Sequence, residues 1–447
     1  MQSIQLKNLK SDDSWAFSNL KRKETSYVTH GYHKYPAKFI PQIVQKLMVE
    51  YSKKKEIVLD PFGGCGTTLV EAKLNERKGI GIDVNRVAVL IAKSKIREIS
   101  PEFLKKKSEI LLKKIDESKI KKDFYSSAHP RLKYWFHRDQ FNKLRKIYEI
   151  IQEEKNKDIK LFYNCCFSNI LKNCSIWYSK SIKPMRDLDK KKVSPSEQFS
   201  KHLKFMVKQN ENFVDQIRKR KIINLPSKML KRDARKTGLK DSSVDLIITS
   251  PPYVISYDYA DLHQLSLLWF KFGDDMKEIR KNFIGSSNKN GLEKMPESKI
   301  ARRILEKMKA KDLTLAKKIN RYFLDMVESL NEMERVLKKD KYLCLIIGNT
   351  EYKNIKIYNA EVCVELLVNL GFKIKKIIKR KLSSKTFTPY RDREGKFTTS
   401  SNGKKRKIYQ YEYIVIAKKR RLNKNVTKKW RWNRSTRKRS KNRKRTR

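Results

Sequence analysis

Short apolar runs alternate with helix-like segments along most of the chain. The runs have the length and the β-branched content of buried strands. Between the later runs, apolar residues recur at helical spacing, as in 319–337 and 362–370. This alternation predicts an α/β fold built on a doubly wound, mostly parallel sheet. The strands are expected at 57–60, 79–83, 244–249, 343–347, 372–378 and 413–416.

The sheet pattern stops in the stretch 101–227, which is helix-like and rich in lysine. We therefore predict a largely helical insertion there. It would separate an N-terminal part of the main domain at 1–100 from a C-terminal part at 228–417. Aromatic groups at 134–136 and 177–178 are expected to pack in the core of the insertion rather than to contact bases.

The chain is strongly basic, with 107 lysines and arginines against 48 acidic residues and a formal net charge of +59. Such a chain binds polyanions, and nucleic acid fits better than an anionic membrane because no lipidation signal or basic amphipathic anchor stands out. The tail 418–447 contains no acidic residue. We expect it to be disordered in isolation and to contact phosphates without sequence preference. The polar segment 383–407 is expected to join the last two strands.

The six cysteines lack the paired spacings of a zinc site or a disulfide framework, so we expect reduced and mostly buried thiols. The N-terminus has no apolar leader segment, and no run approaches about 18 apolar residues. His30 and His33 have no third ligand near them in the sequence, which argues against a metal site. These features favour a soluble, cytoplasmic protein without bound metal and without a membrane partner.

A glycine-rich turn follows the first predicted strand. Residues 58–68 read Val-Leu-Asp-Pro-Phe-Gly-Gly-Cys-Gly-Thr-Thr, and a helix pattern follows directly. The glycines let a ligand approach the backbone, and the helix N-terminus presents free amide groups. Asp83 ends the next strand, about 20 residues further on, where a carboxylate can accept hydrogen bonds from a ribose diol. This arrangement serves NAD and S-adenosylmethionine equally well, and no lysine precedes Thr67 as a Walker phosphate loop requires.

A second turn, Ser250-Pro251-Pro252-Tyr253, follows the predicted strand at 244–249. Two prolines directly after a strand fix the backbone and cannot extend the ladder. The Ser250 hydroxyl and the Pro251 carbonyl would then be held at the carboxyl edge of the sheet, where doubly wound proteins bind ligands. A planar amino group there could donate to both acceptors, while Tyr253 stacks on its ring.

Several motifs resemble those of the DNA methyltransferases that methylate exocyclic amino groups. The run Ser-Pro-Pro-Tyr at 250–253 resembles their motif IV, and the run at 60–68 resembles motif I. The run at 33–41, His-Lys-Tyr-Pro-Ala-Lys-Phe-Ile-Pro, is similar to motif X, which closes over the methionine end of the cofactor. Asp233 resembles the acidic motif III expected near the adenine, and 334–338 is similar to the motif VI region. The insertion contains no recognisable motif of the family.

The resemblance implies a class I methyltransferase with a Rossmann-like fold that uses S-adenosylmethionine and acts on double-stranded DNA. It raises a cognate restriction endonuclease as a candidate partner and requires no metal. We assign target recognition to the insertion by elimination. The residues that the resemblance places at the target amine are Ser250, Pro251, Pro252 and Tyr253. Those that it places at the cofactor are Tyr35, Pro36, Lys38, Phe39, Asp60, Phe62, Gly63, Gly64, Gly66, Thr67, Thr68, Asp83, Asn85 and Asp233.

The mechanism implied by the family is chemically consistent with these residues. The target base leaves the duplex and enters a pocket beside the cofactor. Two acceptors that bind both N–H groups of the amine favour a pyramidal nitrogen, which frees its lone pair for attack on the methyl group. Serine at the first position of motif IV favours cytosine N4, with adenine N6 as the alternative. Cytosine C5 chemistry would need a Pro-Cys nucleophile, which the chain lacks.

Two other classes of protein stay open. An RNA methyltransferase that modifies an exocyclic amine fits the charge equally well. A nucleic-acid-binding protein could also retain the scaffold without catalysis. Both methyltransferase hypotheses require that the turns at 60–68 and 250–253 meet at neighbouring strand ends around one cavity, although these turns lie far apart along the chain.

Overall fold

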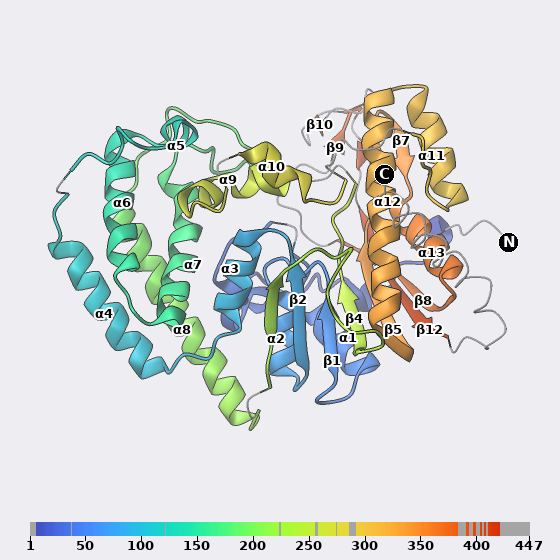
Figure 1. Cartoon of the computed structure of the whole chain (residues 1–447), viewed down its shortest axis with the longest axis horizontal. Helices are drawn as coiled ribbons and strands as arrows, with labels where there is room; N and C mark the ends of the chain where they lie inside the picture. The colour runs from blue at the N-terminus through green and yellow to red at the C-terminus, as the bar shows by residue number, and fades with distance from the viewer. Residues whose placement is uncertain are drawn as a thin grey trace, which may run out of the picture.

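Helices cover a central sheet, and a helical lobe extends from one side of it (Figure 1). The structure is a computed structural model. The residues that it describes are 6–36, 38–120, 122–222, 225–254, 258–273, 275–285, 292–382, 390–392, 397–398, 403–404, 406–407 and 410–420. The expectations for the basic tail beyond 420, and for most of the polar segment 383–407, therefore lie outside the described residues.

Within the described residues the central sheet has seven strands in the order β3-β2-β1-β4-β5-β12-β8. Neighbours from β3 to β5 pair in parallel, whereas β12 is antiparallel to both β5 and β8. The predicted mostly parallel sheet is confirmed. Its strands are β1 Ile57–Asp60, β2 Lys78–Asp83, β3 Lys228–Lys231, β4 Val244–Thr249, β5 Leu337–Ile347, β8 Phe372–Lys381 and β12 Tyr411–Lys419.

The sheet also contains residues that the apolar pattern does not predict as strand. The edge strand β3 reads Lys-Met-Leu-Lys, and so short a polar-flanked run resembles a loop in sequence. β5 begins at Leu337 rather than at the predicted residue 343. Its polar first half also belongs to the sheet, because Leu337 pairs with Val244 of β4. Small antiparallel ladders lie outside the central sheet. They consist of β6 Thr350–Tyr352, β7 Ile355–Ile357, β9 Tyr390–Arg391, β10 Phe397–Thr398 and β11 Arg406–Lys407.

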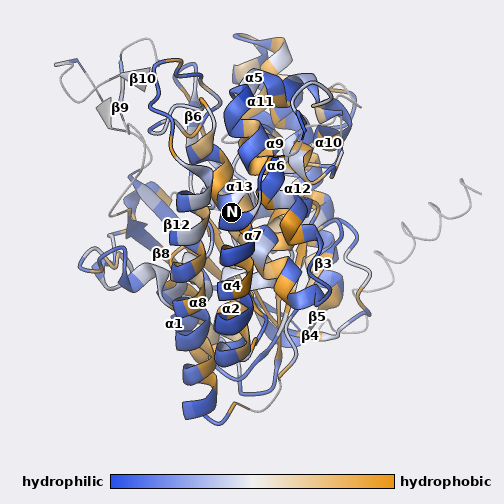
Figure 2. Ribbon diagram, turned by 90° about the vertical axis from the view of Figure 1, so that its left-hand side faces the viewer, coloured by the Kyte–Doolittle hydropathy of each residue, from blue (hydrophilic) through white to orange (hydrophobic). Residues whose placement is uncertain are grey.

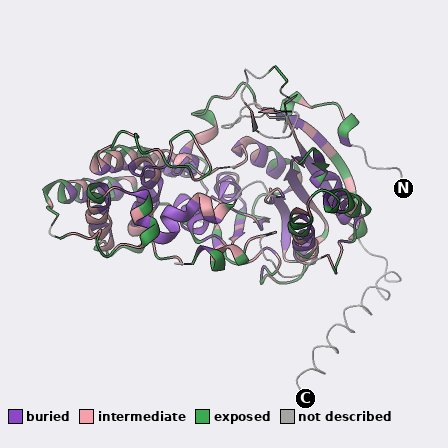
Figure 3. Cartoon of the chain, turned by 90° about the horizontal axis from the view of Figure 1, so that it is seen from above, coloured by how far each residue is buried: buried purple, intermediate pink, exposed green. Residues whose placement is uncertain are grey.

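Alternate residues of the strands feed two separate hydrophobic layers. Leu246 and Ile346 pack with α1 on one face, whereas Ile247 and Leu345 pack with α12 and α13 on the other. The sheet is therefore doubly wound as predicted, and Figure 3 shows buried residues gathered along it. The helices of this part are α1 Pro41–Tyr51, α2 Thr67–Leu74, α3 Arg86–Lys95, α9 Tyr259–Trp269, α10 Met276–Lys281, α11 Lys299–Lys309, α12 Leu313–Val336 and α13 Asn359–Asn369. Short 3-10 helices precede them, η1 Leu6–Asn8, η2 Asp13–Trp15, η3 Glu24–Ser26 and η4 Val28–Gly31.

The predicted helical insertion forms a lobe with a hydrophobic core that also takes in residues of α3 and α9. Ser100 and Ser194 cap its first and last helices, each followed by a proline at the start of the helix. The rings of Trp135 and Trp177 are buried and stack with their centroids 5.0 Å apart, so core packing is confirmed for both, whereas Tyr134 is 51% exposed. Figure 2 shows hydrophobic and hydrophilic residues interleaved along these helices. They are α4 Pro101–Glu117, α5 Pro130–Trp135, α6 Arg138–Gln152, α7 Lys157–Cys174 and α8 Pro195–Lys219.

The cysteines are buried and free, as expected. Burial raises the pKa of the Cys165 and Cys363 thiols to about 12, so neither is a nucleophile near neutral pH. Across the described ranges, no helix has both the length and the apolar character needed to span a bilayer.

The Asp60 carboxylate ties together the ends of two strands and the start of a helix. It accepts hydrogen bonds from the hydroxyls of Thr249, at the end of β4, and Thr68, in α2, both at 2.7 Å, and from the Phe62 amide at 3.1 Å. Asp60 is 1% exposed, and burial raises its pKa to about 6 although the three hydrogen bonds oppose the shift. A buried carboxylate is costly unless its lone pairs are used, so these donors stabilise it. The two turns singled out in the sequence are thereby held at adjacent strand ends.

Substitutions of Asp60 test whether its hydrogen bonds hold the two strand ends together. Asp60→Ala leaves two buried hydroxyls and an amide without their acceptor, so we expect the free energy of unfolding to fall by about 2–4 kcal/mol. Asp60→Asn can still accept from Phe62 and Thr249 and can donate to the Thr68 hydroxyl, so a loss below about 1 kcal/mol is expected. Urea unfolding followed by circular dichroism measures both. Equal stability of the two variants would show that the hydrogen bonds of Asp60 do not hold the strand ends.

Candidate active site

A cavity of about 630 Å³, here called the inner cavity, opens where β1, β2, β3 and β4 end. Doubly wound proteins bind ligands at this edge of the sheet. The turn after β1 and the turn after β4 both line it, so the prediction that they meet around one cavity is confirmed. From the strand ends it is lined by Pro61, Phe62, Gly63, Gly64, Cys65, Thr67, Asp83, Val84, Asn85, Arg232, Asp233, Ala234, Ser250, Pro252 and Tyr253.

The glycine turn forms one wall of the inner cavity. Gly64 has a φ of 47°, a conformation that favours glycine, and its amide donates to Asp83 at 2.9 Å. Gly63 lies against β2, because a Cβ there would come within 3.3 Å of the backbone nitrogen of Ile82. A side chain at either position would therefore strain the turn or crowd the strand that carries Asp83.

Asp83 lines the inner cavity at the end of β2. Its Oδ2 accepts the Gly64 amide and its Oδ1 accepts the Asn85 amide at 2.8 Å. Burial raises the pKa of this carboxyl to about 6, while the two amides act in the opposite direction. A carboxylate oxygen has two lone pairs, so Asp83 can accept further hydrogen bonds from a ligand.

The segment before α1 forms a second wall, with Tyr35, Lys38 and Phe39 lining the inner cavity. A Cβ on Gly64 would meet the Tyr35 ring at 3.5 Å, so this ring covers the glycine turn. Lys38 donates from Nζ to the carbonyl of His30 at 3.0 Å. Burial lowers the Lys38 pKa to about 8, which leaves most of these ammonium groups charged at neutral pH.

Two predicted residues line the inner cavity with side chains already bound to the protein. Asp233 accepts the Arg235 guanidinium at 2.6 Å, and Arg235 also binds Asp325 at 2.7 Å. Asn85 caps α3 through its side-chain oxygen, and its amide nitrogen lies 2.7 Å from His263 Nδ1. Both side chains therefore form part of the wall while they are bound to other residues of the protein.

The turn after β4 stands between the inner cavity and a second, larger space. Ser250, Pro252 and Tyr253 line both, whereas Pro251 lines only the larger one. Tyr253 donates its hydroxyl to Glu412 of β12 at 2.8 Å, which orients the ring. Burial and the Glu412 carboxylate raise the pKa of Tyr253 well above its usual value, so the hydroxyl stays protonated.

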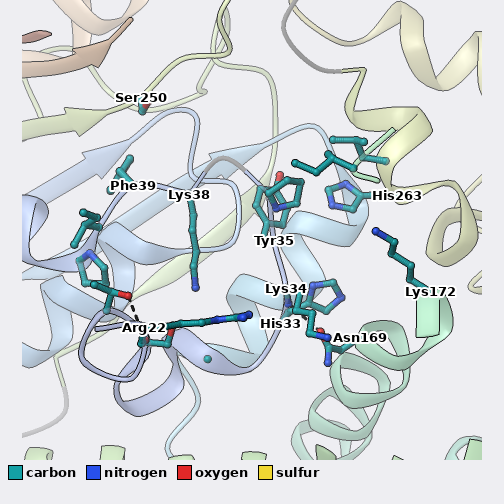
Figure 4. A pocket seen from close by; sticks show the side chains of 18 of the residues that line it. Arg22, His33, Lys34, Tyr35, Lys38, Phe39, Asn169, Lys172, Ser250 and His263 are labelled. Carbon is teal, nitrogen blue, oxygen red and sulfur yellow. Dashed lines mark hydrogen bonds between the residues drawn. The ribbon is translucent and has the colours of Figure 1, made fainter. Parts of the chain in front are cut away.

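The larger space, here called the basic cleft, has a volume of about 2600 Å³ and runs between the sheet domain and the helical lobe. Figure 4 shows Tyr35 between Lys38 and Lys172, with Ser250 further along the same space. Its acidic lining residues are Asp215 and Glu412, and Glu412 is paired with Arg380 at 3.0 Å. The cations that line it are Arg22, Lys23, Lys34, Lys38, Lys172, Lys180, Lys183, Lys201, Lys219 and Arg380. The cleft is thus a positively charged groove that leads to the turn at 250–253.

Four residues expected at the cofactor do not line the inner cavity. Asp60 and Thr68 are bound to each other beneath it, because the fold uses their hydrogen bonds to join strand ends. Gly66 has a φ of 80°, and a Cβ there would lie 2.8 Å from Cβ of Ala92, so this glycine lets α2 approach α3. Pro36 lines the basic cleft instead. Asp60, Gly66 and Thr68 thus have structural roles in the fold, whereas Pro36 lies on the basic cleft.

Sequence reasoning missed a third wall, which comes from α9, α10, residues 282–285 and α12. Arg280 of α10 binds Asp258 at 2.7 Å and also Asp261, and all three line the inner cavity. No sequence signal marks them, because they lie in a segment without periodicity or motif and meet only through folding. The other members of this wall are Tyr259, Leu262, Asn282, Phe283, Ile284, Gly285, Lys318 and Tyr322.

Within the ranges that the structure describes, no group of three or more histidine, cysteine, aspartate or glutamate side chains is placed to hold a metal ion. His30 instead lies 2.8 Å from Glu71, and burial lowers its pKa to about 4. His33 lies 3.0 Å from the Ser168 hydroxyl. Both histidines thus bind other side chains in the protein interior.

The chain is similar in sequence to known type II methyltransferases. The type II methyltransferase M.MvaI of Kocuria varians is 26% identical over 388 residues, which cover 80% of this chain and 85% of that protein. M.AvaI of Nostoc sp., also a type II methyltransferase, is 24% identical over 403 residues, with 78% and 80% covered. A solved SAM-dependent methyltransferase from Methanosarcina mazei shares 11% identity and a TM-score of 0.28 over 84% of this chain and 98% of its own. So low a score adds nothing to the fold assignment, which rests on the strand order.

A family model described as DNA methylase, of the N6/N4 type, matches residues 2–94 and 244–447. The interval between these two parts contains α4 to α8 and β3, so the helical lobe lies outside the matched core. The matched parts carry the glycine turn, Asp83 and the turn at 250–253 that surround the inner cavity. The chain therefore belongs to the N6/N4 family of DNA methylases.

Proposed function

We propose that this chain is an S-adenosylmethionine-dependent methyltransferase that methylates the exocyclic N4 of cytosine in double-stranded DNA. The observation that carries the proposal is the place of Ser250, Pro252 and Tyr253 at the boundary of the inner cavity and the basic cleft. A cofactor in the cavity and a base from the cleft would meet there. The type II methyltransferase relatives support a role as the modification enzyme of a restriction-modification system, with a cognate endonuclease as candidate partner.

The inner cavity has the size and the groups that S-adenosylmethionine needs. Its volume of about 630 Å³ lies in the range of small-molecule sites. Asp83 would accept the ribose hydroxyls, and the glycine turn at Gly63 and Gly64 would lie beside the ligand with its backbone. Lys38 supplies a partly buried cation for a carboxylate, and Asp233 lines the side expected for the adenine. When bound, the cofactor supplies an electrophilic methyl group.

The turn after β4 supplies the acceptors for the target amine. Ser250 Oγ and the Pro251 carbonyl would each accept one N–H of the amino group, which favours a pyramidal nitrogen with a free lone pair. The prolines hold these acceptors rigidly, and Asp60 holds the strand that carries them through Thr249. Tyr253 would stack on the base with its ring fixed by Glu412.

The basic cleft is the proposed path of the DNA. Its cations come from both the sheet domain and the helical lobe, so a duplex bound there would contact both. The base would leave the duplex to reach the turn at 250–253. We keep the helical lobe, 101–227, as the proposed target-recognition region, because α7 and α8 form the wall of the cleft opposite the sheet domain.

Digestion of methylated DNA to nucleosides tests the target base. We expect purified protein, incubated with S-adenosylmethionine and unmodified genomic DNA, to produce N4-methyldeoxycytidine, which mass spectrometry identifies by mass and retention. N6-methyldeoxyadenosine as the sole product would replace cytosine by adenine in the proposal. Methylated nucleosides from RNA, with none from DNA, would move the protein to the RNA-modifying class.

Substitutions in the turn after β4 should remove methyl transfer and leave cofactor binding intact. Ser250→Ala deletes one of two acceptors for the amine, so we expect turnover to fall roughly 10²–10³-fold. Tyr253→Ala should have a similar effect, whereas Tyr253→Phe keeps the ring, loses the hydrogen bonds of the hydroxyl to Glu412 and Ser250, and should lose less. Transfer of tritiated methyl groups to DNA measures the rates, and calorimetry measures cofactor affinity. Wild-type turnover in Ser250→Ala would contradict the proposed amine site.

Asp83 should control cofactor affinity. Asp83→Ala removes the proposed acceptor for the ribose hydroxyls, so we expect the Kd for S-adenosylmethionine to rise about 10–100-fold, as for a lost hydrogen bond to a charged group. Asp116→Ala, an exposed carboxylate in α4, is the matched control and should bind normally. Thermal melting checks that both variants stay folded. An unchanged Kd in a folded Asp83→Ala protein would place the cofactor elsewhere.

A further inference from the structure

A hairpin of the helical lobe reaches the boundary between the inner cavity and the basic cleft. Its tip, residues 179–183, lines the cleft, and Lys183 and Pro184 also line the inner cavity. In the described part of the lobe, Lys183 is the charged side chain that borders both spaces. The lobe therefore places one cation on the same two spaces that Ser250, Pro252 and Tyr253 line, although it belongs to a different part of the chain.

The hairpin is held firmly at its base. Trp177 and Arg186 form an antiparallel bridge, and the Tyr178 amide donates to the Met185 carbonyl at 2.8 Å. Trp177 is buried and stacks on Trp135. The tip is thus carried on a rigid support, and a group on such a support loses little entropy when it binds a ligand.

Two lysines hold the hairpin from inside. Lys190 donates from Nζ to the carbonyls of Lys172, Ser175 and Trp177 at 2.7–2.9 Å, and Lys172 donates from Nζ to the Ser181 carbonyl at 2.6 Å. Burial lowers the Lys190 pKa to about 8. The ammonium groups of Lys172 and Lys190 are thus used in hydrogen bonds to backbone carbonyls, unlike those of the lysines at the tip.

The tip itself carries free positive charge. No acidic residue occurs between Lys172 and Arg186, and the side chains of Lys180 and Lys183 at the tip are exposed. No ion pair to Lys183 exists among the described residues, so its ammonium group is available to an anion. Lys34 and Lys38 also line the cleft, from the segment before α1, and add to the positive field in which a polyanion would lie.

We propose that Lys183 contacts a backbone phosphate beside the target nucleotide, and that the hairpin tip thereby holds the displaced strand at the turn after β4. This inference rests on the proposed function. A base that has left the duplex stays tied to its own phosphates, so a cation at the entrance of the pocket meets them at the point of entry. Lys183 is a positioning residue in this account, because it touches backbone and not the reacting amine.

The experiment compares Lys183→Ala, Lys183→Arg and Lys105→Ala with the wild type. Lys105 is an exposed lysine of α4 that lines neither space, so its variant controls for the loss of one positive charge. Binding of a mixed-sequence DNA duplex is measured by fluorescence anisotropy over a series of salt concentrations. Methyl transfer to unmodified genomic DNA gives KM and kcat, and calorimetry gives the Kd of S-adenosylmethionine alone.

We expect Lys183→Ala to raise the KM for DNA about 5–10-fold and to reduce the slope of log K against log salt by about 1 relative to the wild type. Lys183→Arg should restore both values, because it keeps the charge. Cofactor affinity in the absence of DNA should not change.

Two results would overturn the inference. The first is that Lys183→Ala matches Lys105→Ala in both KM and salt slope, which would mean that the tip makes no special phosphate contact. The second is that Lys183→Ala weakens S-adenosylmethionine binding without DNA, which would assign Lys183 to the cofactor carboxylate. Failure of the proposed function would give a different result. The wild type itself would then transfer no methyl group to DNA, whereas the anisotropy series would still show whether Lys183 contributes to DNA binding.

Discussion

The buried carboxylate of Asp60 is the constraint on which the site depends. It ends β1, yet its hydrogen bonds reach Thr249 at the end of β4 and Thr68 in α2. The two turns that surround the inner cavity therefore share one anchor, and a shift of either strand would break it. A carboxylate in this place costs desolvation energy, which its three donors offset in part. The anchor adds geometric precision at the point where two reacting groups would have to meet.

Two spaces of different character converge on the turn anchored in this way. The inner cavity is small, and its lining includes the glycine turn, aromatic rings and the carboxylates of four aspartates. The basic cleft is several times larger, and its charged lining residues are mostly lysines and arginines. A small cofactor and a polyanion would thus reach the same turn from two different spaces, which share only part of their walls. Separate entry routes suit an enzyme that must exchange its cofactor and release a long DNA product.

The helical lobe is attached to the sheet domain through a hydrophobic core that continues into α9. Its hairpin reaches the site from the side opposite the sheet, so the chain that lies outside the matched family core still contributes to the boundary of the cavity. This arrangement separates the roles physically. The sheet domain would supply the chemistry, and the lobe would supply contacts to the nucleic acid and hold it in place.

Local patterns in the sequence were enough to predict the sheet, the insertion and the two turns. Buried strands need consecutive apolar residues, and tight turns need glycine or proline, so both leave a signature in a few adjacent residues. The order of these signatures also carried the resemblance to the amino-methylating enzymes. The edge strand β3 escaped prediction, because four residues with two lysines bear no such signature.

Roles that depend on contacts between distant residues were decided only by the tertiary structure. In sequence, Asp60, Gly66 and Thr68 are indistinguishable from their neighbours that line the inner cavity, since the motif does not say which way a side chain faces. The wall formed by Asp258, Asp261 and Arg280, and the arrival of Lys183 at the entrance, likewise follow from packing across the chain. The sequence by itself determined which elements form and what chemistry they carry, because those depend on neighbours along the chain. Which groups face the ligand was left to the folded state, because burial and hydrogen bonding depend on neighbours in space.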